Sequence, residues 1–190
     1  MSTTRSTRRP PASRLSPVPP VYSLRRERTT KRRGELAELV FQLIATRMGF
    51  AVCKPYGDSE RYDFVLDARQ SYCHSERRRS LAKQAIVAGE EPAFPRSLPL
   101  LWRVQVKAST QLLNGLYRIN AHRRLGRRAV PYRPGEIDFI AAYIIPEDTW
   151  YIIPLHAVRG TSLLFRRKKD RRPGLYDQYR EAWHLLRPRI

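Results

Sequence analysis

The stretch LWRVQVK, residues 101–107, alternates strictly between apolar and polar side chains. In an extended strand its apolar residues, beginning with Trp102, share one face, and Gln105 and Lys107 lie side by side on the other. An amide and an ammonium group two residues apart, in a very basic chain, indicate a metal-dependent site that acts on a phosphate. Taken alone, the stretch also fits an ordinary strand with a polar outer face.

The composition predicts one globular domain that binds a polyanion. A chain of 190 residues with 42% hydrophobic residues can bury a core and still carry tails. The net charge of +20 and the pI near 11.0 favour nucleic acid as partner over an anionic membrane. No apolar run approaches the ~18 residues of a membrane span. The two cysteines, Cys53 and Cys73, favour a reducing, cytoplasmic location over a disulfide scaffold.

Changes in composition divide the chain into three parts. Residues 1–30 are rich in Ser, Thr, Pro and Arg without apolar periodicity, which predicts a disordered basic N-terminal arm. Residues 31–158 form the expected domain, and within it residues 68–99, with an Arg run and three prolines, read as an insertion between two strands. Residues 159–190 read as a basic C-terminal extension that holds a short helix at 176–186.

The periodicity predicts an α/β (α+β) fold with a central mixed β-sheet flanked by helices. A helix is expected over 34–48 and a stop at Gly49. Its predicted apolar stripe is Leu36, Leu39, Val40, Leu43, Ile44 and Met48. Strands are expected at 50–54, 62–67, 101–107, 116–120, 137–145 and 150–155, and a basic, flexible loop at 122–128. The last two strands are apolar throughout, which is typical of central strands covered on both faces.

The expected strand 62–67 supplies a carboxylate to the polar face of the opening stretch. Asp63 lies on the face opposite Tyr62 and Phe64. If this strand pairs in antiparallel fashion with residues 101–107, Asp63 converges with Gln105 and Lys107. Alone, each of these residues has a structural explanation, as a strand-edge polar group or a solvated cation.

Glu38, on the preceding helix, adds a second carboxylate. Its position near the expected start of the helix, where negative charge is favoured, would also explain Glu38. Oxygen ligands suit a hard divalent cation, commonly Mg²⁺, and a nearby ammonium suits a phosphodiester under attack. The order helix-Glu, strand-Asp, strand-Gln-x-Lys is therefore the candidate constellation.

This order of motifs resembles a known family. The segments GELAE, KPYGD, YDFVLD, RVQVKAS, EIDFIAAYI and WYIIPL, within residues 31–156, are similar to the PD-(D/E)XK endonuclease superfamily. More narrowly, they resemble the branch associated with group I intron homing endonucleases, in which Gln replaces the acid to give QxK. The resemblance implies a restriction-endonuclease-like core over the domain 31–158, DNA as partner and Mg²⁺ or Mn²⁺ as cofactor.

The resemblance also implies a role for each residue of the constellation. Asp63 would be the central metal-binding carboxylate, and Glu38 would complete the metal shell. Gln105 would offer its carbonyl oxygen to the metal or orient a bound water. Lys107 would lower the pKa of the attacking water or stabilise the pentavalent phosphate. Asp58 would assist from the loop before Asp63, whereas a structural role is favoured for Asp138.

Three functions remain open at the level of the sequence. The first is a metal-dependent DNA endonuclease that hydrolyses phosphodiester bonds. The second is a catalytically inactive nucleic-acid-binding protein on the same fold, because Gln105 removes a negative charge from the metal site. The third is a basic structural or RNA-binding protein of unrelated fold, which predicts that Asp63, Gln105 and Lys107 lie far apart. Double-strand cleavage with one site per chain requires two protomers, so the first function predicts a homodimer.

Overall fold

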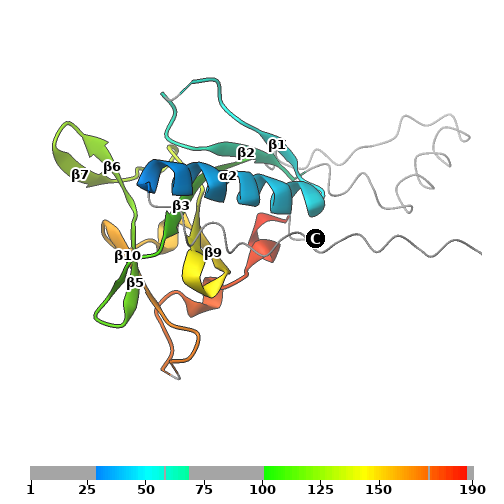
Figure 1. The fold of residues 1–190 in the computed structure, drawn as a ribbon. Coiled ribbons are helices and arrows are strands. Elements are labelled where there is room, and N and C mark those ends of the chain that lie inside the picture. The colour runs from blue at the N-terminus through cyan, green and yellow to red at the C-terminus, as the bar shows by residue number, and fades with distance from the viewer. Residues whose placement is uncertain (1–28, 58, 69–100, 171, 188–190) are drawn as a thin grey trace, which may run out of the picture.

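The computed structural model describes residues 29–57, 59–68, 101–170 and 172–187. They form three layers: a helix, a five-stranded sheet and a three-stranded sheet, with a separate two-stranded hairpin at one end (Figure 1). Residues 1–28 of the expected N-terminal arm, all but the first residue of the expected insertion 68–99, and Asp58 lie outside the described residues.

The central sheet is mixed, as predicted. Its strands are β1 (Ala51–Cys53), β2 (Phe64–Asp67), β3 (Leu101–Ser109), β8 (Phe139–Ile144) and β9 (Thr149–Pro154). They follow one another in that order, and every pair is antiparallel except β3 with β8, which is parallel. The α+β class with a mixed central sheet is therefore confirmed.

The other elements are shorter. The second sheet has the order β10 (Ser162–Arg166), β5 (Leu116–Asn120) and β4 (Leu112–Leu113). The separate hairpin consists of β6 (His122–Leu125) and β7 (Arg128–Pro131). Four 3-10 helices complete the description: η1 (Ile145–Glu147), η2 (Leu155–Ala157), η3 (Asp177–Tyr179) and η4 (Trp183–Leu186).

Helix α2 (Thr30–Arg47) differs from its prediction in where it begins and in the face that it buries. It begins at Thr30, so Glu38 lies mid-helix and not at the helix start. Gly49, with φ +88°, follows the helix end as expected. Of all described helices, none is both long and apolar enough to cross a membrane.

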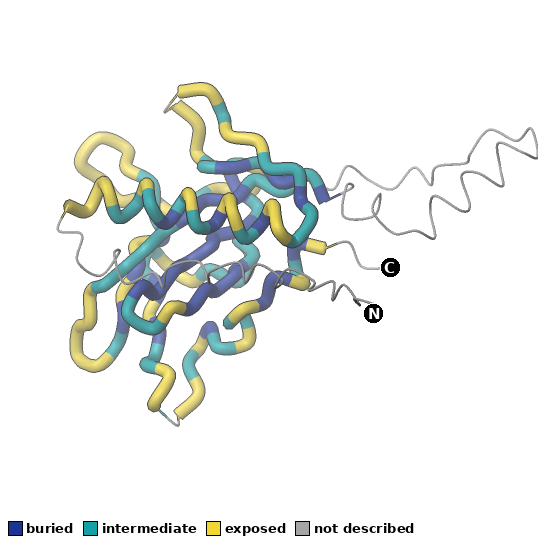
Figure 2. Tube along the Cα trace, turned by 45° about the vertical axis from the view of Figure 1, so that its right-hand side comes forward, coloured by how far each residue is buried: buried dark blue, intermediate teal, exposed yellow. Residues whose placement is uncertain are grey.

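The predicted apolar stripe is confirmed only in part: Leu36, Val40, Ile44 and Met48 pack against the core, but Leu39 and Leu43 do not. Leu39 and Leu43 are 61% and 48% exposed, whereas Ala37, Phe41 and Ala45 are fully buried against the sheet. These three residues follow one another at i, i+4 spacing. The small alanines on either side of Phe41 allow the helix to lie close to the sheet, so the aromatic ring takes the place predicted for leucines. Figure 2 shows the resulting alternation of buried and exposed turns along the helix.

An aromatic cluster joins the helix to the sheet. The ring of Phe41 lies 5.5 Å from Phe64, 5.7 Å from Trp150 and 5.8 Å from Trp183, measured between centroids. Trp150 in turn stacks on Tyr143 at 4.4 Å. Aromatic pairs at these separations contribute about 0.5–1.5 kcal/mol each beyond the apolar area they bury. The cluster therefore fixes α2 against β2, β8 and β9.

A second core lies between the two sheets. Ile140 and Ile153 of the central sheet pack there with Ile119, Leu163 and Phe165 of the three-stranded sheet. Strand β8 is consequently buried on both faces, as its apolar sequence predicted. Strand β9 is also buried, but it ends the strand order, so it is an edge strand and not a central one.

The open edge of β9 is covered by the segment after η3. The Glu181 amide donates to the carbonyl of Trp150, and the Trp150 amide donates to Oε1 of Glu181, both at 2.8 Å. This pairing explains why the helix expected at 176–186 is instead divided into η3 and η4. Glu181 between them has φ +48°, which no α-helix accommodates. The expected loop at 122–128 is also corrected, because it forms the β6–β7 hairpin.

The phase of α2 can be tested by stability. We expect Phe41→Ala to lower the free energy of unfolding by about 3–5 kcal/mol, because it empties a fully buried site. Leu39→Ala, on the exposed side of the same helix, should cost less than about 1 kcal/mol. Urea unfolding followed by circular dichroism measures both. A larger loss for Leu39→Ala than for Phe41→Ala would contradict this packing.

Candidate active site

The pairing of β2 with β3 ends at Asp63. Phe64 is the first paired residue of β2, opposite Val104, and the Asp63 amide donates to the Val104 carbonyl at 2.9 Å. The next amide of β3 that points toward β2 belongs to Val106. It donates to Oδ2 of the Asp63 side chain at 2.7 Å. The carboxylate thus takes the place of the next backbone partner in the ladder.

Gln105 lies beside this carboxylate. Its Nε2 donates to Oδ2 of Asp63 at 2.5 Å, with a longer contact of 3.4 Å to the carbonyl oxygen of Val106. The side chain is 8% exposed, and a buried amide requires such partners. Val104 and Val106 anchor β3 in the core on the helix side. The alternation of β3 therefore places the amide against Asp63, as the strand-pairing argument expected.

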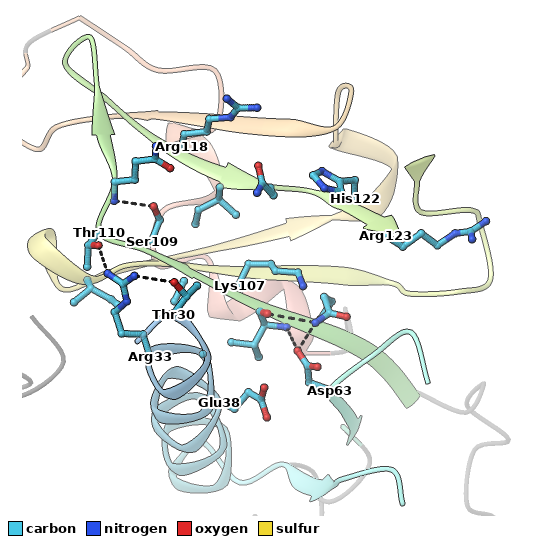
Figure 3. Close-up of a pocket in the computed structure, with 18 of the residues that line it drawn as sticks. Thr30, Arg33, Glu38, Asp63, Lys107, Ser109, Thr110, Arg118, His122 and Arg123 are labelled. Carbon is cyan, nitrogen blue, oxygen red and sulfur yellow. Dashed lines mark hydrogen bonds between the residues drawn. The ribbon is translucent and has the colours of Figure 1, made fainter. Parts of the chain in front are cut away.

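Lys107 and Glu38 border the same space. Lys107 follows Gln105 on the same face of β3, is half-buried, and interacts electrostatically with Asp63 (Figure 3). Glu38 projects from α2 and accepts a hydrogen bond from Nζ of Lys54 at 2.9 Å. All four predicted site residues line one cleft with a volume of about 640 Å³.

The rest of the cleft wall is basic. Its further cationic residues and its histidine are Arg33, Arg118, Arg123, Arg124 and His122. Arg33 donates to Oγ1 of Thr110 at 2.5 Å, and Arg118 donates to Oγ of Ser162 at 3.1 Å. In Figure 3, Arg33 and Thr110 lie on the opposite side of Lys107 from Asp63. The cleft thus has carboxylates toward one end and hydrogen-bond donors along the other.

The cleft raises the pKa of Asp63 to about 6. Burial is the main cause, because it disfavours the charged carboxylate, and the charge of Glu38 acts in the same direction. The Val106 amide, followed by Lys107 and Lys54, opposes the rise. Burial likewise raises the pKa of Tyr132, on the cleft wall, to about 12, with the charge of Asp63 as the next cause. This phenol therefore remains a neutral hydrogen-bond donor at physiological pH.

The oxygen donors in the cleft fit a hard divalent cation. Mg²⁺ commonly binds through one or two carboxylates and keeps several waters. Asp63 and Glu38 can supply the carboxylates, and Oε1 of Gln105 can add a neutral oxygen. Within the described part of the chain, neither Oδ1 of Asp63 nor Oε1 of Gln105 accepts a hydrogen bond. No three His, Cys, Asp or Glu residues of that part gather closely enough to enclose a metal, so a cation here depends on water and substrate for further ligands.

Asp138 lies outside the cleft and has a structural role. Its carboxylate accepts three hydrogen bonds from Arg103: from the backbone amide at 2.8 Å, and from Nε and Nη2 at 3.0 Å each. Arg103 also donates to the carbonyl of Gly135. These bonds attach the loop before β8 to β3, which agrees with the role favoured from the sequence.

Several cleft residues were not predicted from the sequence. Arg33, Thr110, Arg118 and Tyr132 reach the cleft from α2, the end of β3, β5 and the loop after β7. Only the fold brings these distant positions together. Arg118 could have been anticipated, because it alternates with buried Tyr117 and Ile119 in β5 and must point outward.

Comparisons with known proteins show what the chain is similar to. The family model of the PD-(D/E)XK endonuclease matches residues 98–186, a range that includes Gln105 and Lys107 but neither Glu38 nor Asp63. No curated protein matches the chain. The resemblance to PD-(D/E)XK endonucleases is confirmed.

One solved structure refines this class. The bacterial homing endonuclease I-Ssp6803I is similar to the chain with 28% sequence identity and a TM-score of 0.59. The match covers 83% of this chain and 93% of that one. The similarity to a homing endonuclease that the QxK motif implied is therefore supported by the fold as well as by the sequence.

The raised pKa of Asp63 predicts a pH-dependent stability. The folded state holds a proton on Asp63 up to a pKa of about 6, whereas the unfolded chain releases it near 3.8. Folding therefore becomes less favourable as pH rises between these values. In chelator-treated protein, we expect Asp63→Asn to raise the free energy of unfolding by about 1–3 kcal/mol at pH 7.5 and by almost nothing at pH 4.

Urea unfolding across this pH range measures the effect. Glu35→Gln, which neutralises an exposed carboxylate on α2, is the matched control and should show no such pH dependence. A gain for Asp63→Asn that is equal at pH 4 and pH 7.5 would contradict the assignment.

Proposed function

We propose that this protein is a metal-dependent DNA endonuclease that hydrolyses phosphodiester bonds at the cleft. The observation that carries the proposal is the convergence of Asp63, Gln105 and Lys107 on one cleft with Glu38. An unrelated fold with scattered residues would not produce it. The comparisons support nuclease chemistry, and the basic cleft wall supports a polyanionic substrate.

In this proposal Asp63, Glu38 and Gln105 would hold Mg²⁺ or Mn²⁺. When bound, such a cation would supply Lewis-acid polarisation of the phosphate and would lower the pKa of a water molecule beside it. Asp63 is suited to this role because two N–H groups fix its Oδ2 while Oδ1 accepts no hydrogen bond in the described part of the chain. Gln105 contributes through its carbonyl oxygen, with its Nε2 directed at Asp63.

Lys107 supplies a second positive charge, which is present whether or not a metal ion is bound. Its ammonium borders the space in front of Asp63 and can neutralise charge that develops on the phosphate oxygens. It can also lower the pKa of the attacking water. Its position on β3, one pleat from Gln105, keeps it in register with the metal ligands.

The substrate, the assembly and the cellular location are parts of the same proposal. Arg33, Arg118 and the β6–β7 hairpin offer contacts to DNA phosphates. Cutting both strands would require a homodimer, since the described part of each chain holds one such cleft. A cytoplasmic location follows from the sparse cysteines, and Cys53 is a free, exposed thiol.

A catalytically inactive nucleic-acid-binding protein is the second candidate. The specific observation in its favour is Gln105, whose amide carries no negative charge and weakens a metal site. The basic surface serves both candidates equally. Only cleavage itself separates them.

Cleavage of plasmid DNA tests the first candidate. We expect purified protein with Mg²⁺ to nick supercoiled plasmid and excess chelator to abolish the nicking. Asp63→Ala and Lys107→Ala should each lower the nicking rate by at least about 100-fold, because the first would remove a metal ligand and the second a positive charge beside the phosphate. Lys169→Ala, at an exposed lysine outside the cleft, is the matched control and should retain full activity.

Two outcomes would count against this reading. Nicking that survives both Asp63→Ala and Lys107→Ala would refute the proposed site. DNA binding without cleavage of any substrate would favour the inactive protein.

Gln105→Glu tests the proposed metal site through an expected gain in Mg²⁺ affinity. Without metal the new carboxylate faces Asp63 in place of a donor, so we expect a lower melting temperature in chelator. With Mg²⁺ the added charge should strengthen binding, and the half-saturating Mg²⁺ concentration should fall about tenfold. Thermal unfolding across a Mg²⁺ titration measures both effects.

The matched control is Gln111→Glu, an exposed amide of the same cleft that does not contact Asp63. It should leave the Mg²⁺ dependence unchanged. Equal Mg²⁺ dependence in the wild type and both variants would show that no cation binds beside Gln105.

A further inference from the structure

The β6–β7 hairpin stands apart from the rest of the fold. Its strands pair from His122 opposite Pro131 to Leu125 opposite Arg128, and they form a sheet of their own. A two-residue turn joins them, with Gly126 at φ +60°, a conformation that glycine tolerates at the first position of a tight hairpin turn. In Figure 1 the hairpin projects from one end of the molecule.

The base of the hairpin is held firmly. Nδ1 of His122 lies 3.0 Å from the carbonyl oxygen of Thr161, and the neighbouring Ala121 amide donates to the same oxygen at 2.9 Å. Arg123, whose side chain is 9% exposed, forms an ion pair with Glu136 at 3.1 Å. The hairpin is therefore positioned by its base, although its strands do not join either of the larger sheets.

The outer part of the hairpin is exposed and basic. Every residue from 124 to 129 is exposed. This segment contains Arg124, Arg127 and Arg128 and no acidic residue. Because an isolated two-stranded hairpin is only marginally stable, an exposed, charged one that flanks a cleft suggests a binding element more than a packing element.

The hairpin continues the cleft on one of its faces. His122 and Arg124 alternate on the same face of β6, and both line the cleft that contains Asp63 and Lys107. The guanidinium group of Arg123 is instead paired with Glu136 at the base of the hairpin. Arg124 is exposed on the cleft face of β6, and Arg127 is exposed in the turn, whereas Arg128 pairs opposite Leu125 and so lies on the other face of the hairpin.

The dimensions of the hairpin match those of a DNA groove. The major groove of B-DNA is ~12 Å wide and ~8.5 Å deep and admits a two-stranded β-ribbon. Four strand residues extend ~10 Å from base to turn. A hairpin whose base lies at the phosphates of the cleft can therefore reach base edges with its tip.

We infer that β6–β7 is a sequence-reading element that enters the major groove next to the phosphate bound in the cleft, with Arg124 and Arg127 contacting base edges. This inference rests on the proposed function for its substrate, duplex DNA. Guanine is the expected base, because the planar fork of arginine matches O6 and N7 of guanine. Arg33 and Arg118, which also line the cleft, then contact phosphates, which carry no sequence information.

Binding selection from a randomised duplex library tests the inference. The full-length protein is used in chelator, so that no cleavage is needed for the readout. We expect the wild type to enrich a sequence with fixed guanines. Arg124→Ala and Arg127→Ala should each lower the preference at one or two base pairs by about 5- to 150-fold. Arg124→Lys should lose the preference but retain the salt dependence of binding, because it keeps the charge without the fork.

Two matched arginine variants serve as controls. Arg118→Ala should weaken binding to all sequences alike. Arg47→Ala, in the last turn of α2 and outside the cleft, should change neither affinity nor preference. Thermal unfolding of each variant verifies that it is folded.

Three results would overturn the inference. The first is a wild type without sequence preference. The second is a uniform loss of affinity in Arg124→Ala and Arg127→Ala, which would mean phosphate contacts alone. The third is equal binding of duplex RNA, whose deep, narrow major groove excludes the hairpin.

The inference can fail or hold independently of catalysis. Sequence preference that depends on Arg124, without any nicking in Mg²⁺, refutes the endonuclease but supports the hairpin as reader. Nicking that is lost in Asp63→Ala, combined with no effect of Arg124→Ala on preference, supports the endonuclease and refutes the reader.

Discussion

The fold around the cleft depends on a single backbone amide, that of Val106. It points away from β8 on a strand whose antiparallel neighbour has already ended, and burial makes an unpaired amide costly. Asp63 resolves this by placing its carboxylate where the next residue of β2 would have been. The same burial that makes the bond necessary also raises the pKa of the carboxyl group. A structural requirement of the sheet therefore creates a carboxylate that a cation can stabilise.

The aromatic cluster brings the other parts of the cleft to this point. Phe41 packs on Phe64, the residue next to Asp63, and so fixes the helix that carries Glu38. Trp183 joins the same cluster from the C-terminal segment, whose Glu181 covers the edge of β9. The segment expected to be an extension thus stabilises the sheet on which the site is built.

Side-chain directions that follow from strand alternation could be predicted from the sequence. Features that depend on contacts between distant segments could not. Alternation in 101–107 placed Gln105 and Lys107 on one face, because a strand has a fixed period of two. In α2 both Phe41 and Leu39 lie at helical spacing, and only the flanking alanines and the aromatic cluster decide which is buried. The hairpin at 122–131 has the turn Gly126–Arg127 without the Asn-Gly or Asp-Gly pair that marks a hairpin most strongly, and so it read as a loop. Tyr132 and Arg33 enter the cleft only through the folded chain.

Gln105 links metal binding to DNA binding under the proposed function. Its neutral oxygen leaves Asp63 and Glu38 as the two carboxylates of the described cleft, fewer charges than a strong Mg²⁺ site provides. A phosphate oxygen of bound DNA can supply the missing negative ligand, as substrate phosphates commonly do for Mg²⁺. The basic wall then acts before the cation does, because it holds that phosphate in place. Under this proposal a cleft with weak metal ligands and strong phosphate contacts would favour the cation chiefly when DNA is bound, and hydrolysis would be restricted to DNA that the protein already holds.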